Sequence, residues 1–251
     1  MKNVFQAWSD AIACGVFMVC ALGLPTVQGQ TIQVVTETTP YTYLKGDRVI
    51  GAATEVVEKT LQSAGLTDFK IKIYPWARAY DMALKEPDVL IYLIARTSVR
   101  ESQFKWAGEI MKIQYHLYRL RVRTEVDVKT LDEAKKYTIG VMRDDVRHQY
   151  LQSKGFTRLV VSAQWIDNFN KLIKRQVDLV PLTDDDAATL CTQAHFDCAA
   201  LERVLTLDEA STGLYMAYSS LTADETVQKT SIAFDKLKAD GMVRKIMQRK
   251  P

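Results

Sequence analysis

The chain has 251 residues, of which 47% are hydrophobic and 25% are charged, and its formal net charge at pH 7 is +3. This composition excludes a disordered chain, because a polypeptide of this length and apolar content can bury a sizeable core. Acidic and basic residues are nearly balanced and spread along the sequence. No basic stripe therefore marks a surface for nucleic acid, and we expect no nucleic-acid partner.

Residues 1–29 have the pattern of a cleaved signal peptide. Lys2 is followed by an almost uncharged apolar run over 11–24, and small residues come next. Because this run is too short for a comfortable membrane span, we expect cleavage after Gly29 and export to the periplasm. A retained membrane anchor is the alternative, since Asp10 weakens the basic start of the segment.

From Thr31 onward, short β-branched or aliphatic runs alternate with longer segments of helical periodicity, which is typical of an α/β fold. The expected strands cover 32–36, 70–74, 89–94, 117–122, 138–142, 159–161, 179–182 and 214–218. The expected helices are 53–63, a helix opened by a capping box of Thr130 and Glu133, a helix after Ser162, and two helices over 223–247 broken at Asp240 and Gly241.

Two cysteines, Cys191 and Cys198, follow the expected cleavage site. Export brings them into an oxidising compartment, which favours a disulfide between them. Metal binding is the alternative, but His195 is the one other soft ligand nearby and the spacing fits no standard zinc pattern. We expect a disulfide, no metal and no cofactor.

Residues typical of enzyme active sites form no recognisable motif in this sequence. The three histidines, His116, His148 and His195, are not paired at metal-ligand spacing, and there is no GxSxG, HExxH or glycine-rich phosphate loop. The one tight acidic cluster, 184–186, is equally well explained as a helix N-terminus, where acids complement the helix dipole. The sequence therefore predicts a binding protein and not an enzyme.

Polar and aromatic residues follow three of the expected strands, over 37–43, 74–79 and 96–101. Ligands of open α/β sheets gather beyond the carboxyl ends of strands, so these segments are candidate ligand contacts. The ordered set of a signal peptide, TETTPYTY, YPWARAY, RTSVRE, FKW and LKADGMVRKI resembles the family 3 extracellular solute-binding proteins, which are the amino-acid-type receptors of ABC transporters.

The resemblance implies an α/β, two-lobed periplasmic binding protein-like fold of type II. Each lobe would have a central, mostly parallel sheet flanked by helices, and two hinge strands would join the lobes. Lobe one would comprise 30–117 and 212–251, and lobe two would comprise 118–211. A monomer of this kind closes on a small molecule held between the lobes.

The resemblance also implies particular contacts to that molecule. Arg100 matches the arginine that grips the α-carboxylate of the ligand, a task that suits its guanidinium fork. Trp76 and Tyr41 match aromatic positions that pack on the ligand, although Trp76 could instead belong to the core of lobe one. In lobe two, the loop 143–147 matches the segment whose backbone amides meet the carboxylate. The expected ligand-binding residues are Arg100, Trp76, Tyr41, Arg78, Arg96, Thr97, Tyr92, Arg143, Asp145 and Asp184.

The chain departs from the family pattern at two places, which leaves the ligand open. Leu93 and Ala95 stand where the amino-acid binders have small hydroxyl residues, and the acid expected to receive the ammonium group falls nearer Thr183 than Asp184. The additional arginines around the expected cleft fit a ligand with more than one anionic group equally well; they are Arg78, Arg96, Arg143 and Arg147.

The expected function is a periplasmic solute-binding protein that captures a small polar, amino-acid-like or carboxylate-bearing ligand for the permease of an ABC transporter. One alternative is a ligand-sensing receptor that docks onto a signalling partner in the membrane. The other is a dehydratase-type enzyme on the same scaffold, with Glu37 or Asp184 as the proton-transfer group.

Overall fold

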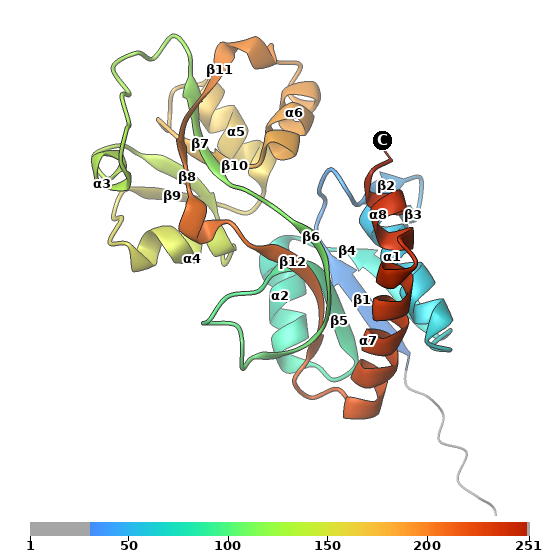
Figure 1. The fold of residues 1–251 in the computed structure, drawn as a ribbon. Coiled ribbons are helices and arrows are strands. Elements are labelled where there is room, and N and C mark those ends of the chain that lie inside the picture. Colours follow the sequence, from blue (N-terminus) through green and yellow to red (C-terminus); the bar gives the residue numbers. More distant parts are fainter. Residues whose placement is uncertain (1–30, 250–251) are drawn as a thin grey trace, which may run out of the picture.

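The computed structural model describes residues 31–249, which form two lobes joined by two extended segments (Figure 1). The predicted signal peptide lies outside the described residues. Within the described part of the chain, no helix combines the length and the apolar character needed to cross a membrane.

The first lobe is built on a five-stranded sheet with the order β4-β1-β5-β12-β6. Strand β1 pairs in parallel with β4 and β5, whereas β12 runs antiparallel to both β5 and β6. All seven residues of β5 are buried, as expected for a central strand covered on both faces. The strands are β1 (Ile32–Thr36), β4 (Phe69–Ile73), β5 (Val89–Ala95), β6 (Phe104–Lys112) and β12 (Gly213–Ser219).

Helices cover both faces of this sheet (Figure 1). One face carries α1 (Ala52–Ser63), α7 (Asp224–Ala239) and α8 (Met242–Met247), which share an apolar core with β1 and β5. The other face carries α2 (Trp76–Lys85). Gly108 in β6 allows α7 to pack closely, because a Cβ atom there would lie 2.2 Å from the ring of Phe234. A small hairpin, β2 (Tyr43–Lys45) and β3 (Arg48–Ile50), precedes α1.

The second lobe has a three-stranded antiparallel sheet, β10-β7-β11, and a parallel pair, β8 and β9. A parallel bridge between Ile139 and Leu179 connects the two. The strands are β7 (His116–Leu120), β8 (Ile139–Met142), β9 (Leu159–Ser162), β10 (Val180–Leu182) and β11 (Leu201–Thr206). The helices are α3 (Leu131–Ala134), α4 (Val146–Ser153), α5 (Trp165–Ile173), α6 (Asp184–Gln193) and the 3₁₀ turns η1 (Cys198–Ala200) and η2 (Asp208–Ala210).

The predicted α/β class with two lobes is confirmed, but the sheets are more mixed than the mostly parallel arrangement that was expected. In the first lobe, β12 enters from the second lobe at the edge where β5 ends, so Leu214 lies beside Ala95 and the two strands run in opposite directions. In the second lobe, both partners of β7 are antiparallel to it. Strand β6 leaves the first lobe and β12 returns to it at the same end of the sheet, so the two strands run in opposite directions.

Two neighbouring segments carry the chain between the lobes. The first crosses between Lys112 and His116 and the second between Thr206 and Gly213. They are hydrogen-bonded to each other, since the Ile113 N–H donates to the Thr212 carbonyl at 3.0 Å and the Leu207 N–H donates to the Tyr115 carbonyl at 2.8 Å. The expected hinge strands 117–122 and 214–218 belong instead to the sheets of the lobes. The lobe boundaries near 117 and 212 stay predictions.

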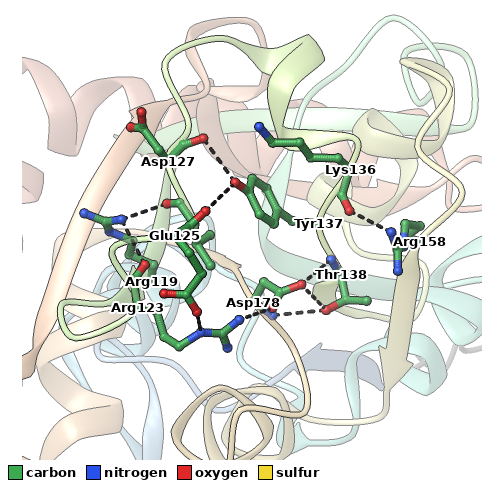
Figure 2. Close-up of polar contacts among 10 residues, drawn as sticks. Arg119, Arg123, Glu125, Asp127, Lys136, Tyr137, Thr138, Arg158 and Asp178 are labelled. Atoms are coloured by element: carbon green, nitrogen blue, oxygen red, sulfur yellow. Dashed lines mark hydrogen bonds and ion pairs between the residues drawn. The ribbon is translucent and has the colours of Figure 1, made fainter.

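Polar contacts clip one long loop of the second lobe to its sheet (Figure 2). Arg119 donates to the carbonyl of Arg123 at 3.0 Å, and Arg123 in turn donates to Asp178 at 3.0 Å. Asp178 also accepts from the backbone N–H of Thr138 at 2.8 Å, so the loop before α3 is tied to the start of β8. Arg119, Arg123 and Asp178 are thus all bound to other groups of the same lobe.

The Cys191–Cys198 disulfide is present and joins the last turn of α6 to η1, with Cα atoms 5.6 Å apart. The prediction of a bridge is confirmed. A bonded pair has no thiolates to offer, which removes the metal-site alternative for these two cysteines.

Candidate functional site

Two adjoining cavities lie between the lobes. The larger has a volume of about 320 Å³ and the smaller about 50 Å³. Both are lined by the segment 37–40 after β1, by Trp76 at the start of α2, and by Trp165 and Asp186 from the second lobe. A volume of this size suits a molecule at the small end of the ligand range, for which pockets are about 300–1,000 Å³.

The first lobe contributes residues that directly follow parallel strands. Glu37 comes after β1, and Trp76 opens α2 shortly after β4. Trp76 is buried, stacks on Tyr80 at 5.8 Å between ring centroids, and also lines both cavities. Trp76 therefore belongs to the core of the first lobe and also forms part of the cavity wall, and its packing on a ligand stays a prediction.

One carbonyl group of the second lobe, that of Asp144, accepts two hydrogen bonds from the first lobe. The indole N–H of Trp76 and Nη2 of Arg100 both donate to this oxygen, each at 2.9 Å. Asp144 lies between β8 and α4 with a positive φ of 58°. We call this pair of interlobe hydrogen bonds the Asp144 latch.

Arg100 is fully buried at this contact and lines the smaller cavity. Its Nη1 donates to the carbonyl of Ala95 at 3.3 Å, and its guanidinium carbon lies 4.9 Å from the ring centroid of Tyr80. Of its side-chain nitrogens, Nε is buried without a partner among residues 31–249, as is the indole nitrogen of Trp165. The role of Arg100 as the grip for a carboxylate stays a prediction, because in this arrangement its fork is turned to backbone carbonyls.

On the side of the second lobe, a buried ion pair occupies the start of α4. Asp145 caps the helix by accepting the backbone N–H of Arg147 at 2.8 Å, and it also binds the guanidinium of Arg147 through two hydrogen bonds of 2.6 and 2.9 Å. Arg147 further contacts Asp186 at 3.3 Å and lies 3.7 Å from the ring centroid of Trp165. Such multiple contacts are what a buried pair requires to offset the loss of water.

Glu37 differs from these paired charges. Within residues 31–249 its half-buried carboxyl group has no hydrogen-bond or ion-pair partner. Burial raises the pKa of Glu37 well above the ordinary value, and repulsion from Asp145 and Asp186 raises it further, while Arg147 acts in the opposite direction. The site thus contains one carboxyl group that no cationic side chain or hydrogen-bond donor of the described residues binds.

Tyr41 and Asp145 lie where the sequence placed them, at the cleft. Tyr41 lines the smaller cavity, and its hydroxyl donates to Asp185 across the lobes. Asp145 lines the same cavity, but its carboxylate is held by Arg147. Their direct contact with a ligand stays a prediction.

Tyr92, expected to face the ligand, lies in the core, and this expectation is wrong. It is fully buried in β5, and its hydroxyl is hydrogen-bonded to Thr42 at 2.9 Å and to Thr54 at 3.0 Å. Because side chains of a strand alternate between faces, Tyr92 points toward α1 while its neighbours Leu93 and Ala95 line the smaller cavity.

Three other residues expected at the ligand follow β5 or open α2, yet line neither cavity. Arg96 is bound by Glu101 through two hydrogen bonds of 2.8 and 2.5 Å on the surface. Arg78 packs over the ring of Tyr74 at 4.6 Å. Thr97 contributes through its carbonyl, which accepts the backbone N–H of Arg100 at 3.0 Å and so helps to turn that residue inward.

The two remaining corrections concern the second lobe. Arg143 is exposed and lines neither cavity. Asp184 is also exposed and accepts the hydroxyl of Tyr118, while Asp186 lines both cavities. The acidic cluster forms the first turn of α6, where Thr183 and Asp186 make a capping box. Asp184 and Asp186 are two positions apart on this turn, so they lie on different sides of the helix and Asp186 is the one that faces the cleft.

Sequence reasoning missed Trp165, which lines both cavities. It is the first residue of α5, after β9, and therefore occupies the same kind of strand-to-helix junction as the three segments that were singled out. The same rule applied to this fourth junction would have found it.

No profile of a known protein family and no curated protein matches the sequence. Solved structures do match, and one is a histidine kinase sensor domain with similarity to periplasmic binding proteins, with a TM-score of 0.76 over 86% of this chain and 94% of that chain at 16% identity. The chain has the fold of the periplasmic binding proteins.

Two further structures with this periplasmic binding protein fold are described by their ligands. An ancestral arginine-binding protein bound to arginine matches with a TM-score of 0.74 over 88% of this chain and 97% of that chain, at 16% identity. ArtJ, an arginine-, lysine- and histidine-binding protein from Geobacillus stearothermophilus, gives the same TM-score and coverage at 15% identity. At such identities the likeness establishes the fold, and the ligand of this chain has to be inferred from its own cleft.

Proposed function

We propose that this chain is a solute-binding protein that captures a small polar molecule between its lobes and delivers it to the permease of an ABC transporter. The observation that carries this proposal is the interlobe cavity of about 320 Å³, whose polar and aromatic lining comes from both lobes. A ligand that touches both lobes favours the closed arrangement, which is how hinged two-lobe proteins signal occupancy.

The proposal includes a periplasmic monomer. The pattern of residues 1–29 supports export, and the Cys191–Cys198 bridge is consistent with an oxidising compartment. An amino-acid-like or carboxylate-bearing solute is supported by the ligands of the two described neighbours and by the position of Arg100 at the cleft.

A sensory receptor is the second candidate, because one of the matching structures is the sensor domain of a histidine kinase. The dehydratase alternative has less support, since Asp184 lies outside both cavities and Glu37 has no partner with which to exchange a proton. The matched structures that are described by a ligand are binding proteins.

The test is a thermal-shift survey of the mature protein with amino acids, amines, dicarboxylates and sugars. A solute at one hundred times its Kd stabilises the folded state by about 2.7 kcal/mol. For a chain of this size that raises Tm by about 5–10 °C, at about 2–4 °C per kcal/mol.

The variant Trp165→Ala should lose this shift, whereas Trp106→Ala, a matched control outside both cavities, should keep it. Turnover of a stabilising solute would contradict the proposal and favour the enzyme. Genetic loss of a signalling response with transport intact would favour the sensor.

A further inference from the structure

We propose that the solute is a small organic cation, recognised by its positive group against Glu37 between Trp76 and Trp165, and that a carboxylate on it contributes little. The inference rests on the proposed function and narrows the ligand class of the same site.

The charges that line the larger cavity have one sign. Among the described residues, Glu37 and Asp186 are the charged side chains of this lining, and no lysine, arginine or histidine joins them. An anionic group in this space would meet two carboxyl groups, while the nearby cation, Arg147, is already paired with Asp145 and Asp186. A cationic group would meet favourable charge in surroundings that screen it poorly.

The same cavity has aromatic walls, which also favour a cation. Tyr74, Trp76 and Trp165 line it. An indole ring attracts a positive group placed over its face, and the contact gains strength when water is excluded. The guanidinium carbon of Arg147 lies 3.7 Å from the ring centroid of Trp165, so this indole already makes a cation–π contact within the protein.

The groups that could hold a carboxylate are occupied by the chain itself. Arg100 donates to two backbone carbonyls, and Arg147 is bound at both ends of its fork by Asp145. The start of α4, another anion site, is capped by the Asp145 carboxylate. An incoming carboxylate would have to displace these partners beside Asp145 and Asp186, which repel it.

Among the buried side-chain donors of residues 31–249 that line the cavities, two have no partner: Nε of Arg100 and the indole N–H of Trp165. If Arg100 turned to bind a carboxylate with its fork, it would give up its hydrogen bond to Asp144, which is one of the two bonds of the Asp144 latch. A cation in the larger cavity leaves the latch intact.

A monovalent cation would bring the net charge of the cleft to zero once Glu37 is ionised. Asp145 and Asp186 are balanced by Arg100 and Arg147, all four of which line the smaller cavity together with Glu37. Burial and the two neighbouring aspartates raise the pKa of Glu37, which favours its protonated form in the absence of a cation. A bound cation stabilises the ionised form, and Glu37 releases that proton on binding.

Calorimetry on the mature protein with matched pairs of probes tests this inference. Each pair shares its positive group and differs by a carboxylate: agmatine and L-arginine, putrescine and L-ornithine, choline and glycine betaine. We expect at least one carboxylate-free cation to bind, with a Kd no weaker than that of its partner. Its affinity should rise with pH across the mildly acidic range as Glu37 ionises more readily.

The variant Glu37→Gln should weaken binding of that cation tenfold or more and remove most of the pH dependence. Glu101→Gln, an exposed glutamate of the same lobe, should change neither. Thermal unfolding of both variants shows whether each remains folded.

Tenfold or tighter binding of the carboxylate-bearing member of a pair, or failure of all three cations to bind, would overturn the inference. If another solute of the thermal survey still stabilised the protein, the proposed function would stand. If none did, the proposed function would fail as well.

Discussion

The two cavities of the cleft differ in how the charged side chains of their linings are paired. Around the smaller cavity the arginines and aspartates are satisfied by the chain itself, through the Asp145–Arg147 pair and the Asp144 latch. Glu37, which lines both cavities, has no partner among residues 31–249 and lies beside the aromatic walls of the larger one. Paired charges stabilise the shape of a cleft, whereas an unpaired charge is free to recognise a ligand, which is why we propose Glu37, and not the arginines, as the group that selects the ligand.

The largest effect should follow from breaking the buried ion pair. Arg147→Met leaves Asp145 buried without its cation, a loss of about 3–5 kcal/mol in the free energy of unfolding. Denaturant melts measure it. The double variant Asp145→Leu with Arg147→Met removes both charges and should recover much of the loss; equal loss in both variants would show that packing of Arg147 on Trp165, and not its charge, holds the site.

The next effect should come from the latch. Arg100→Lys keeps a charge but loses the fork that reaches Ala95 and Asp144, and hydrogen bonds from charged groups are worth about 1.5–3 kcal/mol. We expect tenfold or weaker binding of the solute, with a larger radius of gyration in solution scattering of the empty protein. Weakened binding without the change in radius would mean that Arg100 contacts the ligand directly.

A smaller effect, of opposite sign, is expected for the stability of Glu37→Gln. The pKa of Glu37 is raised in the folded protein, so folding favours the protonated carboxyl group. This causes no loss of stability below the unfolded pKa, but ionisation of Glu37 destabilises the folded state increasingly as pH rises toward the folded pKa. At neutral pH the variant should therefore melt higher than wild type without ligand, by about 2–4 °C for each kcal/mol relieved. At pH 4 the difference should shrink. A variant that melts lower at neutral pH would contradict this account.

The smallest effect is expected for Arg96→Ala. Its pair with Glu101 lies at the surface, and exposed pairs contribute about 0–1 kcal/mol. Solute affinity should stay within about twofold of wild type, as measured by calorimetry. A tenfold loss of affinity would show instead that Arg96 contributes to ligand binding.

Much of the fold could be predicted because many elements are strongly patterned. Strand β1 begins and ends where expected, and the helix break falls at Gly241, whose φ is 70°. Strand β6 was missed because register shifts opposite β12 break its alternation. Strand β11 was missed because Glu202 and Arg203 interrupt its apolar run.

The candidate site was predictable at the level of segments and less so at the level of side chains. The segments after β1, β4 and β5 do reach the cleft, through Glu37, Trp76 and Arg100. Which arginine after β5 turns inward, Arg96 or Arg100, depends on a turn at Thr97 that follows from packing and not from residue type. Helix phase likewise separates Asp184 from Asp186.

The Asp144 latch is made entirely by the chain, which bears on how a transporter would recognise its cargo. Trp76 and Arg100 belong to the first lobe and the Asp144 carbonyl to the second, so these two hydrogen bonds favour the closed arrangement independently of any contact that a solute makes. A bias toward the closed arrangement raises the apparent affinity for a solute, because less of the binding free energy is used to close the lobes. If the protein delivers its solute to a permease, as we propose, closure would then distinguish loaded from empty protein less sharply, and the charge at the mouth of the cleft would be a second difference between the two.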